Sequence, residues 1–186
     1  MPASRPETGV EIREPRTDAE FERYYDLRWR ILREPWTRQR ESGRDELEDS
    51  AFHLTAWRGE RLIGVGRLHF NSSEEAQVRY MAVEEDCRGK GAGSAILREL
   101  ERHAGERGAA RIVLNARQGA VDFYRRHGYA TTRHAGTLFG IEHWEMQKTL
   151  SCGAGNPDRK PAFRPAGPAG KRVRSLKDCP TWLLDL

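Results

Sequence analysis

A six-residue glycine-rich stretch, RGKGAG at residues 88–93, constrains the fold of this chain more than any other segment. Glycines at alternate positions leave the backbone N–H groups unshielded. The pattern before the stretch, at residues 78–83, predicts a strand, and the pattern after it, at residues 94–107, predicts an amphipathic helix. Because the first N–H groups of a helix have no intrahelical partner and lie at its positive end, the stretch predicts an anion-binding turn. A glycine-rich turn without a ligand is the alternative that this spacing leaves open.

Two better-known phosphate-binding loops do not match this stretch. A P-loop carries Gly-x-x-x-x-Gly-Lys-Ser/Thr, and the dinucleotide-binding fingerprint requires a third glycine where this chain has Ser94. The remaining pattern, Arg/Gln-x-x-Gly-x-Gly/Ala between a strand and a helix, resembles the acyl-CoA loop of the GNAT family of N-acetyltransferases. The resemblance implies that the bound anion is the pyrophosphate of CoA.

A second motif lies downstream. The segment LNARQGAVDFYRRHGY, residues 114–129, resembles the second GNAT signature, in which a strand ends in Asn and the next helix carries Phe-Tyr before Gly-Tyr. The resemblance extends to a bacterial GNAT subgroup that is often fused to a thioesterase-like domain, and it covers residues 10–150. The segments that resemble this subgroup are LRWRILREPW (27–36), GRLHF (66–70), QVRYMAV (77–83) and LFGIEHWEMQK (138–148). Nothing after residue 150 resembles the thioesterase-like domain.

The remaining patterns predict an α/β fold. Strands are expected at residues 10–14, 52–57, 62–70, 77–83, 111–115, 129–132 and 140–150, and helices at 18–34, 94–107 and 118–127. Strand, glycine loop, helix and strand make a βαβ unit with parallel strands. We therefore expect a single mixed, mostly antiparallel sheet of about seven strands with flanking helices, the acyl-CoA N-acyltransferase fold that the resemblance implies.

One folded domain, residues 10–150, is expected between a flexible N-terminus at residues 1–9 and a Pro/Gly-rich basic tail at residues 151–186. The tail holds five of the nine prolines and few apolar residues before the terminal WLLDL, so its composition predicts disorder, with WLLDL as a docking patch. It also holds seven basic and three acidic residues, which leaves 25 of each before it. Because the net charge of +4 lies entirely in the tail, the domain lacks the charge pattern of a nucleic-acid binder.

Composition also excludes other classes of protein. No apolar run approaches the ~18 residues of a membrane span, and the start of the chain lacks the apolar core of a signal peptide, so a cytoplasmic protein with no membrane partner is expected. Three cysteines without metal-ligand spacing support neither a disulfide framework nor a zinc site, and no metal cofactor is expected. Cys87, beside the glycine loop, is interpreted as a bystander thiol.

The GNAT resemblance implies acetyl-CoA, or another acyl-CoA, as cosubstrate and direct attack by a primary amine in a ternary complex. Attack requires a neutral amine, stabilisation of the oxyanion and a proton for the departing thiolate. Tyr124 is the predicted general acid, because a phenol with a pKa of about 10 holds its proton until the thiolate develops. A plain core aromatic on an amphipathic helix is the alternative for this residue.

By the same resemblance, the pantetheine arm pairs with the strand at residues 81–83, whose amides also polarise the thioester carbonyl, and Asn115 faces this arm. The loop backbone holds the pyrophosphate, to which Arg88 and Lys90 add positive charge. The predicted cofactor-binding residues are Met81, Ala82, Val83, Arg88, Gly89, Lys90, Gly91, Ala92, Gly93, Ser94 and Asn115.

Spacing does not identify the general base. Candidates are His69, His143, His53 and Glu34, or an ordered water, and the subgroup resemblance places the first two above the others. The acidic cluster of Asp45, Glu46, Glu48 and Asp49 is predicted to be a solvated helix face, in preference to a site for a cationic substrate.

The resemblance further implies a small-molecule or peptide amine as acceptor and a homodimer as an assembly common among similar proteins. A catalytically inactive module that senses acyl-CoA is the alternative function. A third hypothesis, binding of nucleic acid or a membrane surface, depends on the basic tail alone.

Overall fold

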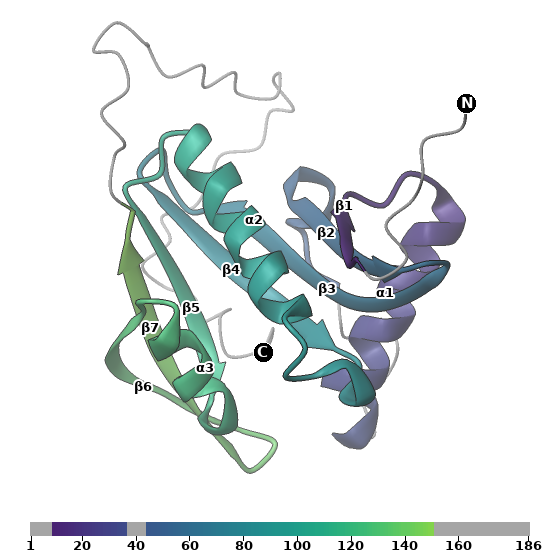
Figure 1. The fold of residues 1–186 in the computed structure, drawn as a ribbon. Helices are drawn as coiled ribbons and strands as arrows, with labels where there is room; N and C mark the ends of the chain where they lie inside the picture. The colour runs from purple at the N-terminus through teal and green to yellow at the C-terminus, as the bar shows by residue number, and fades with distance from the viewer. Residues whose placement is uncertain (1–8, 37–43, 151–186) are drawn as a thin grey trace, which may run out of the picture.

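A seven-stranded sheet organises the chain in the computed structural model, which describes residues 9–36 and 44–150 (Figure 1). The strand order is β1-β2-β3-β4-β5-β7-β6, and every neighbouring pair is antiparallel except β4 and β5. The strands are β1 (Glu11–Arg13), β2 (Phe52–Arg58), β3 (Arg61–Phe70), β4 (Glu75–Val83), β5 (Arg111–Arg117), β6 (Ala130–Leu138) and β7 (Ile141–Thr149). The predicted mixed, mostly antiparallel sheet with one parallel βαβ unit is confirmed.

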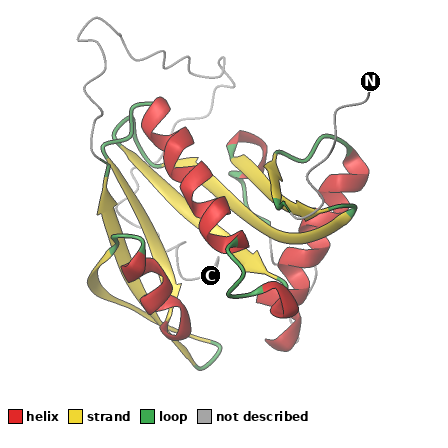
Figure 2. Cartoon of the chain, viewed as in Figure 1, coloured by secondary structure: helices red, strands yellow, loops and turns green. Residues whose placement is uncertain are grey.

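Helices cover both faces of this sheet (Figure 2). The α-helices are α1 (Asp18–Leu32), α2 (Ala92–Glu106) and α3 (Val121–Arg126), and short 3-10 turns are η1 (Glu34–Trp36), η3 (Glu48–Ser50), η4 (Glu85–Cys87) and η5 (Gln118–Ala120). The predicted flexible N-terminus, apart from Gly9, and the predicted basic tail lie outside the described residues.

Several predicted boundaries are wrong. The helix predicted at 18–34 ends at Leu32, because the backbone of Arg33 leaves helical geometry one residue before Glu34-Pro35. The helix predicted at 118–127 is a 3-10 turn followed by α3. The strand predicted at 129–132 continues to Leu138, since β6 lies at the sheet edge, where two register shifts and polar residues hide the alternation.

The core lies mainly between the sheet and α2. The apolar stripe of α2, which includes Ile96, Leu97 and Leu100, is fully buried against the strands. The helix approaches β3 so closely that a Cβ added at Gly66 would lie 2.7 Å from the Ile96 side chain. A smaller cluster on the opposite face packs α1 against β3 and β4 through residues such as Leu27.

A bulge in β4 divides the sheet. Val65 of β3 pairs with Ala82 and Arg67 pairs with Arg79, so two residues of β4, at positions 80 and 81, oppose one residue of β3. Tyr80 has a φ of +53°, which a side chain-bearing residue rarely adopts. In the described chain, β4 and β5 pair only over residues 75–77 and 111–113, and beyond this point the two strands diverge (Figure 1).

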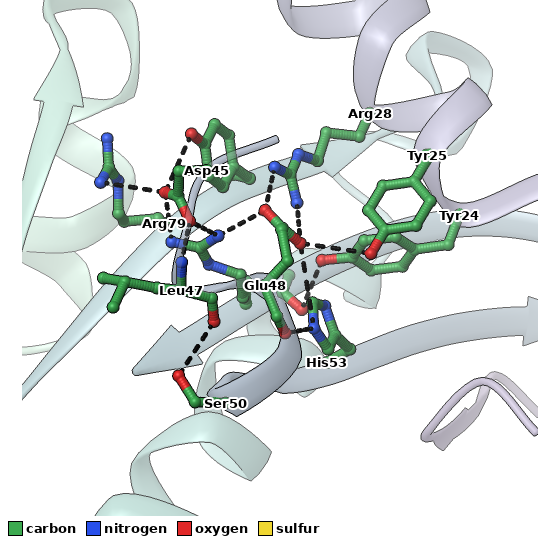
Figure 3. Close-up of polar contacts among 12 residues, drawn as sticks. Tyr24, Tyr25, Arg28, Asp45, Leu47, Glu48, Ser50, His53 and Arg79 are labelled. Carbon is green, nitrogen blue, oxygen red and sulfur yellow. Dashed lines mark hydrogen bonds and ion pairs between the residues drawn. The ribbon is translucent and has the colours of Figure 1, made fainter. Parts of the chain in front are cut away.

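The acidic cluster is only partly the solvated face that was predicted. Glu46 and Asp49 are exposed, but the side chains of Asp45 and Glu48 are buried, and the segment is a turn leading into η3. Asp45 accepts two hydrogen bonds from Arg67, at 2.7 and 2.8 Å, and Glu48 accepts from both Arg67 and Arg28. Guanidinium groups thus neutralise these carboxylates within the fold. Figure 3 shows Asp45 between Arg79 and Glu48.

Hydrogen bonds and charge pairing with Arg67 lower the pKa of Asp45 to about 2, against the opposing effect of its burial. The two carboxylates come from the turn before β2, whereas Arg28 lies on α1 and Arg67 on β3. This buried ion network therefore joins the turn to both the helix and the sheet.

The Arg67→Met variant is expected to lose about 3–5 kcal/mol of unfolding free energy, because removing one partner leaves buried carboxylates without their counter-charge. The control is Arg102→Met, which removes solvent-exposed ion pairs with Glu99 and Glu106 on α2 and should change stability far less, because water and salt screen such pairs. Urea unfolding measures both. Equal losses in the two variants would show that the buried ion network adds no net stability.

Candidate active site

A cleft of about 110 Å³ lies where β4 and β5 diverge. Strand β4 contributes residues 77–81 and β5 contributes residues 114–117. The remaining lining residues are Leu32 at the end of α1, Ala120 and Tyr124 at α3, and His143 of β7. Because an ordinary ladder would have filled this space with backbone hydrogen bonds, the cleft is a direct consequence of the bulge.

The cleft passes between the two faces of the sheet. Met81 packs against the core on the α2 side, and Tyr124 approaches it from α3. Arg117 pairs across the ladder with His143, so their side chains share a face, and Arg117 Nη2 donates to the Leu32 carbonyl oxygen of α1 at 2.9 Å. Groups on the α2 side and groups on the α1 side therefore meet in one opening.

The Tyr124 side chain lies in the core and reaches the cleft. The residue belongs to the hydrophobic core and is 8% exposed, while its hydroxyl lies 3.6 Å from the sulfur of Met81 in the cleft. Burial raises the pKa of this phenol above its ordinary value. The phenol is thus held in its protonated form at neutral pH, as a proton donor must be.

The glycine loop forms an open turn at the start of α2. Gly89 and Gly91 have φ values of +71° and +90°, and among the described residues no atom outside the adjacent residues lies within 4 Å of a Cβ added at either position. The first backbone bond of α2 runs from the N–H of Ala95 to the carbonyl of Gly91, which is the N-cap. The N–H groups of residues 92–94 therefore point out of the helix, into open space that suits a phosphate.

Side chains connect this loop to α3. His127 of the turn after α3 is hydrogen-bonded through Nε2 to the Ser94 hydroxyl (2.9 Å), and its Nδ1–H donates to the Phe123 carbonyl oxygen (2.8 Å). A Cβ added at Gly93 would contact the Phe123 ring at 3.5 Å. The helix that carries Tyr124 is consequently packed against the loop.

The predicted site residues fall into two groups. Met81, Asn115 and Tyr124 meet in the cleft, while Arg88 to Ser94 form the loop beyond the end of β4. Ala82 and Val83 connect the two groups along β4. Past Gln77 this strand pairs with β3 on one side and with no described strand on the other. The unpaired backbone edge is suited to an extended ligand.

The two charged side chains of the loop bend back onto the backbone that precedes the loop. Arg88 Nε donates to the Val83 carbonyl oxygen at 3.1 Å, and Lys90 Nζ donates to the Asp86 carbonyl oxygen at 2.8 Å. Both side chains are exposed, so they place positive charge at the loop without covering it.

Among the candidate bases, only His143 lines the cleft. Its Nδ1–H donates to the Ile141 carbonyl oxygen at 2.9 Å, which leaves Nε2 as the proton acceptor. Burial, together with Arg117 and Arg33, lowers the pKa of His143 and keeps the ring neutral. His69 is buried outside the lining with its pKa lowered to about 4, chiefly by burial.

The other two candidates lie elsewhere. His53 Nε2 is hydrogen-bonded to the Glu48 carbonyl oxygen at 2.8 Å, within the buried ion network. Glu34 is exposed beyond the end of α1.

Sequence reasoning missed the cationic side of the cleft. Arg79 and Arg117 line it, and Arg33 lies behind the Tyr80 ring. The alternation of side chains along β4 and β5 places Arg79 and Arg117 on the sheet face opposite the core. Only the bulge, which the sequence does not reveal, directs both side chains toward the cleft.

Residues 9–36 and 44–150 contain no group of three or more His, Cys, Asp or Glu side chains arranged to hold a metal ion. Within the same ranges, no helix has the length and apolar character needed to cross a membrane.

Comparison with known proteins identifies this architecture. A family model described as "Acetyltransferase (GNAT) family" matches residues 21–129, more than half of the chain. The Bacillus subtilis protein named "Uncharacterized N-acetyltransferase YjcF" is 34% identical over 105 residues, which cover 56% of this chain and 74% of that protein. An acyl-CoA N-acyltransferase from Pseudomonas aeruginosa has a similar fold, with a TM-score of 0.64 at 20% identity, covering 76% of this chain and 99% of that one. A GNAT acetyltransferase from Elizabethkingia anophelis, solved with acetyl-CoA bound, has a TM-score of 0.61 at 18% identity, covering 77% and 99%.

The divided sheet, the glycine loop and these likenesses define an acyl-CoA-dependent N-acyltransferase. The chain belongs to the acetyltransferase (GNAT) family.

Replacing Gly91 by Ala is expected to weaken CoA binding about tenfold, because a Cβ is strained at a φ of +90° and the N-cap must shift to relieve it. The matched control is Gly59→Ala in the β2–β3 turn, where φ is +59° and the surrounding space is equally open. Both variants should lose similar stability, but only Gly91→Ala should lose affinity in calorimetric titration with CoA. Equal CoA affinity in the two variants would argue against phosphate binding at the loop.

Proposed function

We propose that this N-acyltransferase transfers an acetyl group from acetyl-CoA to a primary amine by direct attack within a ternary complex. The observation that carries the proposal is the cleft at the β4 bulge, where Tyr124 lies on one side and His143 on the other. Thioester and amine can then meet from opposite faces of the sheet.

The described residues fit the cosubstrate. The pyrophosphate binds the N–H groups of residues 89–94, with added charge from Arg88 and Lys90. The pantetheine arm runs along the unpaired edge of β4 at residues 81–83 and forms strand-like hydrogen bonds with it. Asn115 faces the arm from β5.

The reaction forms a C–N bond and breaks the C–S bond of the thioester. His143 Nε2 takes the proton that the amine loses, and the N–H groups of β4 stabilise the oxyanion. Tyr124 donates its hydroxyl proton to the departing sulfur. The burial that raises the pKa of the phenol raises that of the thiol as well, because both anions are poorly solvated in the cleft, so the proton can pass to sulfur.

The alternative of an inactive acyl-CoA sensor is not favoured, since the chain belongs to an acetyltransferase family and the YjcF relative is named an N-acetyltransferase. Membership of the thioesterase-linked subgroup, a cytoplasmic location and a homodimer stay predictions.

The purified protein is expected to release free thiol from acetyl-CoA in the presence of a suitable primary amine. In Tyr124→Phe, kcat should fall at least about a hundredfold with the CoA dissociation constant unchanged, because only the proton donor is removed. The control is Tyr129→Phe, whose ring lies 5.7 Å from that of Tyr124 but whose hydroxyl is outside the cleft lining. Full turnover in Tyr124→Phe would remove this residue from the mechanism, and CoA binding without turnover across a broad amine panel would favour the sensor.

For the base, His143→Gln is expected to lower kcat about a hundredfold, since glutamine cannot accept the amine proton. In the wild type, kcat/KM should fall as the pH drops through the pKa of His143, which lies below its ordinary value of about 6.5. The variant should lose this acidic decline of the pH profile. The control is His134→Gln, an exposed histidine paired with Glu142. An unchanged pH profile in His143→Gln would assign the proton transfer to water.

A further inference from the structure

A serine–histidine pair connects the glycine loop to α3. Ser94 is the third residue of α2, so its hydroxyl lies at the helix end whose backbone N–H groups are proposed to bind the pyrophosphate. His127 is the C-cap of α3, and its Nε2 atom lies 2.9 Å from the Ser94 hydroxyl oxygen. Both side chains are half-buried, so neither is sealed off from a ligand bound at the loop.

The hydrogen bonds of the His127 ring define where its proton lies. Nδ1 is 2.8 Å from the Phe123 carbonyl oxygen, which can only accept, so the neutral ring carries its proton on Nδ1. Nε2 is then an acceptor, and the Ser94 hydroxyl donates its single proton to it. In this state Ser94 presents only oxygen lone pairs to the loop, and it cannot donate a hydrogen bond to a phosphate.

Protonation of His127 reverses the direction of this hydrogen bond. An imidazolium donates from both nitrogens, so Nε2–H donates to the Ser94 oxygen while Nδ1–H keeps its bond to Phe123. The hydroxyl proton of Ser94 is then free to turn toward an anion at the loop. A bound pyrophosphate favours the protonated ring for two reasons, because it accepts this hydrogen bond and because its negative charge attracts the imidazolium.

The charged side chains on the elements around the pair are mostly cationic or paired. The cations are exposed and comprise Arg88 and Lys90 of the loop, Arg98 one turn after Ser94 on α2, and Arg125 and Arg126 of α3. Of the acidic residues, Asp86 pairs with Arg61, Glu99 with Arg102 and Asp122 with Arg125, while Glu85 is exposed in η4. Because the cations oppose protonation of the ring and a bound phosphate favours it, the proton balance of the pair depends on the ligand.

We infer that binding of CoA is coupled to protonation of His127, which turns the Ser94 hydroxyl toward the pyrophosphate. His127 is a positioning residue, since it acts on the ligand through Ser94. The inference rests on the proposed binding of CoA at the loop and adds a residue that lies outside the glycine motif. The proton comes from the solvent and returns to it when CoA leaves. CoA affinity therefore falls as the pH rises, because the neutral ring takes back the hydroxyl proton.

The test is calorimetric titration of the protein with CoA at about pH 6, 7 and 8, in buffers of different ionisation enthalpy. The dependence of the observed heat on the buffer gives the number of protons taken up. We expect uptake of about 0.5 proton per CoA at about pH 7, and about fivefold weaker binding at about pH 8 than at about pH 6. Titration of the phosphate monoester of CoA itself would give the opposite sign, because a low pH removes negative charge from the ligand.

Two variants locate the coupling at the pair. His127→Gln keeps an N–H donor at every pH, and Ser94→Ala removes the hydroxyl. Each should take up less than about 0.2 proton, and its CoA affinity should vary less than about twofold over the same pH range. His127→Gln should also bind CoA at about pH 8 at least as tightly as the wild type, which the loss of a merely structural contact would not produce. The control is His134→Gln on β6, an exposed histidine paired with Glu142, which should keep the full uptake.

The wild type and the two variants together decide the inference. Uptake that persists in His127→Gln, or no uptake by the wild type, would overturn it. Uptake that is lost in His127→Gln but kept in Ser94→Ala would show that the imidazole acts on the phosphate directly, and would overturn the part assigned to Ser94.

Thiol release from acetyl-CoA, measured in parallel, separates this inference from the proposed function. CoA binding with proton uptake but without thiol release to any amine would contradict the proposed function and support the coupling. Thiol release without proton uptake on CoA binding would support the function and overturn the coupling.

Discussion

The bulge at Tyr80 is the feature on which the rest of the site depends. A residue with a side chain at a φ of +53° costs about 1–2 kcal/mol, and such strain persists only where the surroundings stabilise it. Here Arg28 stacks on the Tyr80 ring at 3.5 Å, and the Tyr80 hydroxyl donates to Asp45. Without the extra residue, β4 would continue its ladder with β5 and the cleft would close. The backbone strain at Tyr80 is therefore coupled to the cleft in which the acyl transfer is proposed to take place.

The buried ion network connects stability to this geometry. Arg28 and Arg67 hold the two carboxylates of the turn before β2, and both also lie within 5 Å of the Tyr80 ring centre. The same groups thus support the bulge and neutralise the acidic cluster. Because Asp45 and Glu48 are paired with arginines, they do not form the site for a cationic substrate that was the less favoured interpretation of the cluster from sequence.

Much of the fold and part of the site follow from local patterns. The glycine loop, α2 and the parallel β4–β5 unit are encoded by residues close together in sequence, as are the positions of Tyr124 and Asn115. The bulge could not be predicted, because Tyr80 fits a regular strand and is turned by contacts with arginines far away in the chain. The burial of Asp45 and Glu48 could not be predicted either. Their charge predicts side chains exposed to solvent, and only the structure shows that they pair with arginines of α1 and β3. The sequence left the general base open among several candidates, and only the β5–β7 pairing shows that His143 lies beside Arg117 at the cleft. Its role as the base stays a proposal.

The central claim is that the thioester lies in the cleft opened by the bulge, with its phosphates on the glycine loop. The most direct measurement is a crystal structure of the protein with CoA. The account predicts the CoA sulfur within about 3.5 Å of the Tyr124 hydroxyl and the pyrophosphate on the N–H groups of residues 89–94. A sulfur atom outside the space between β4 and β5, or phosphates bound away from the loop, would contradict it.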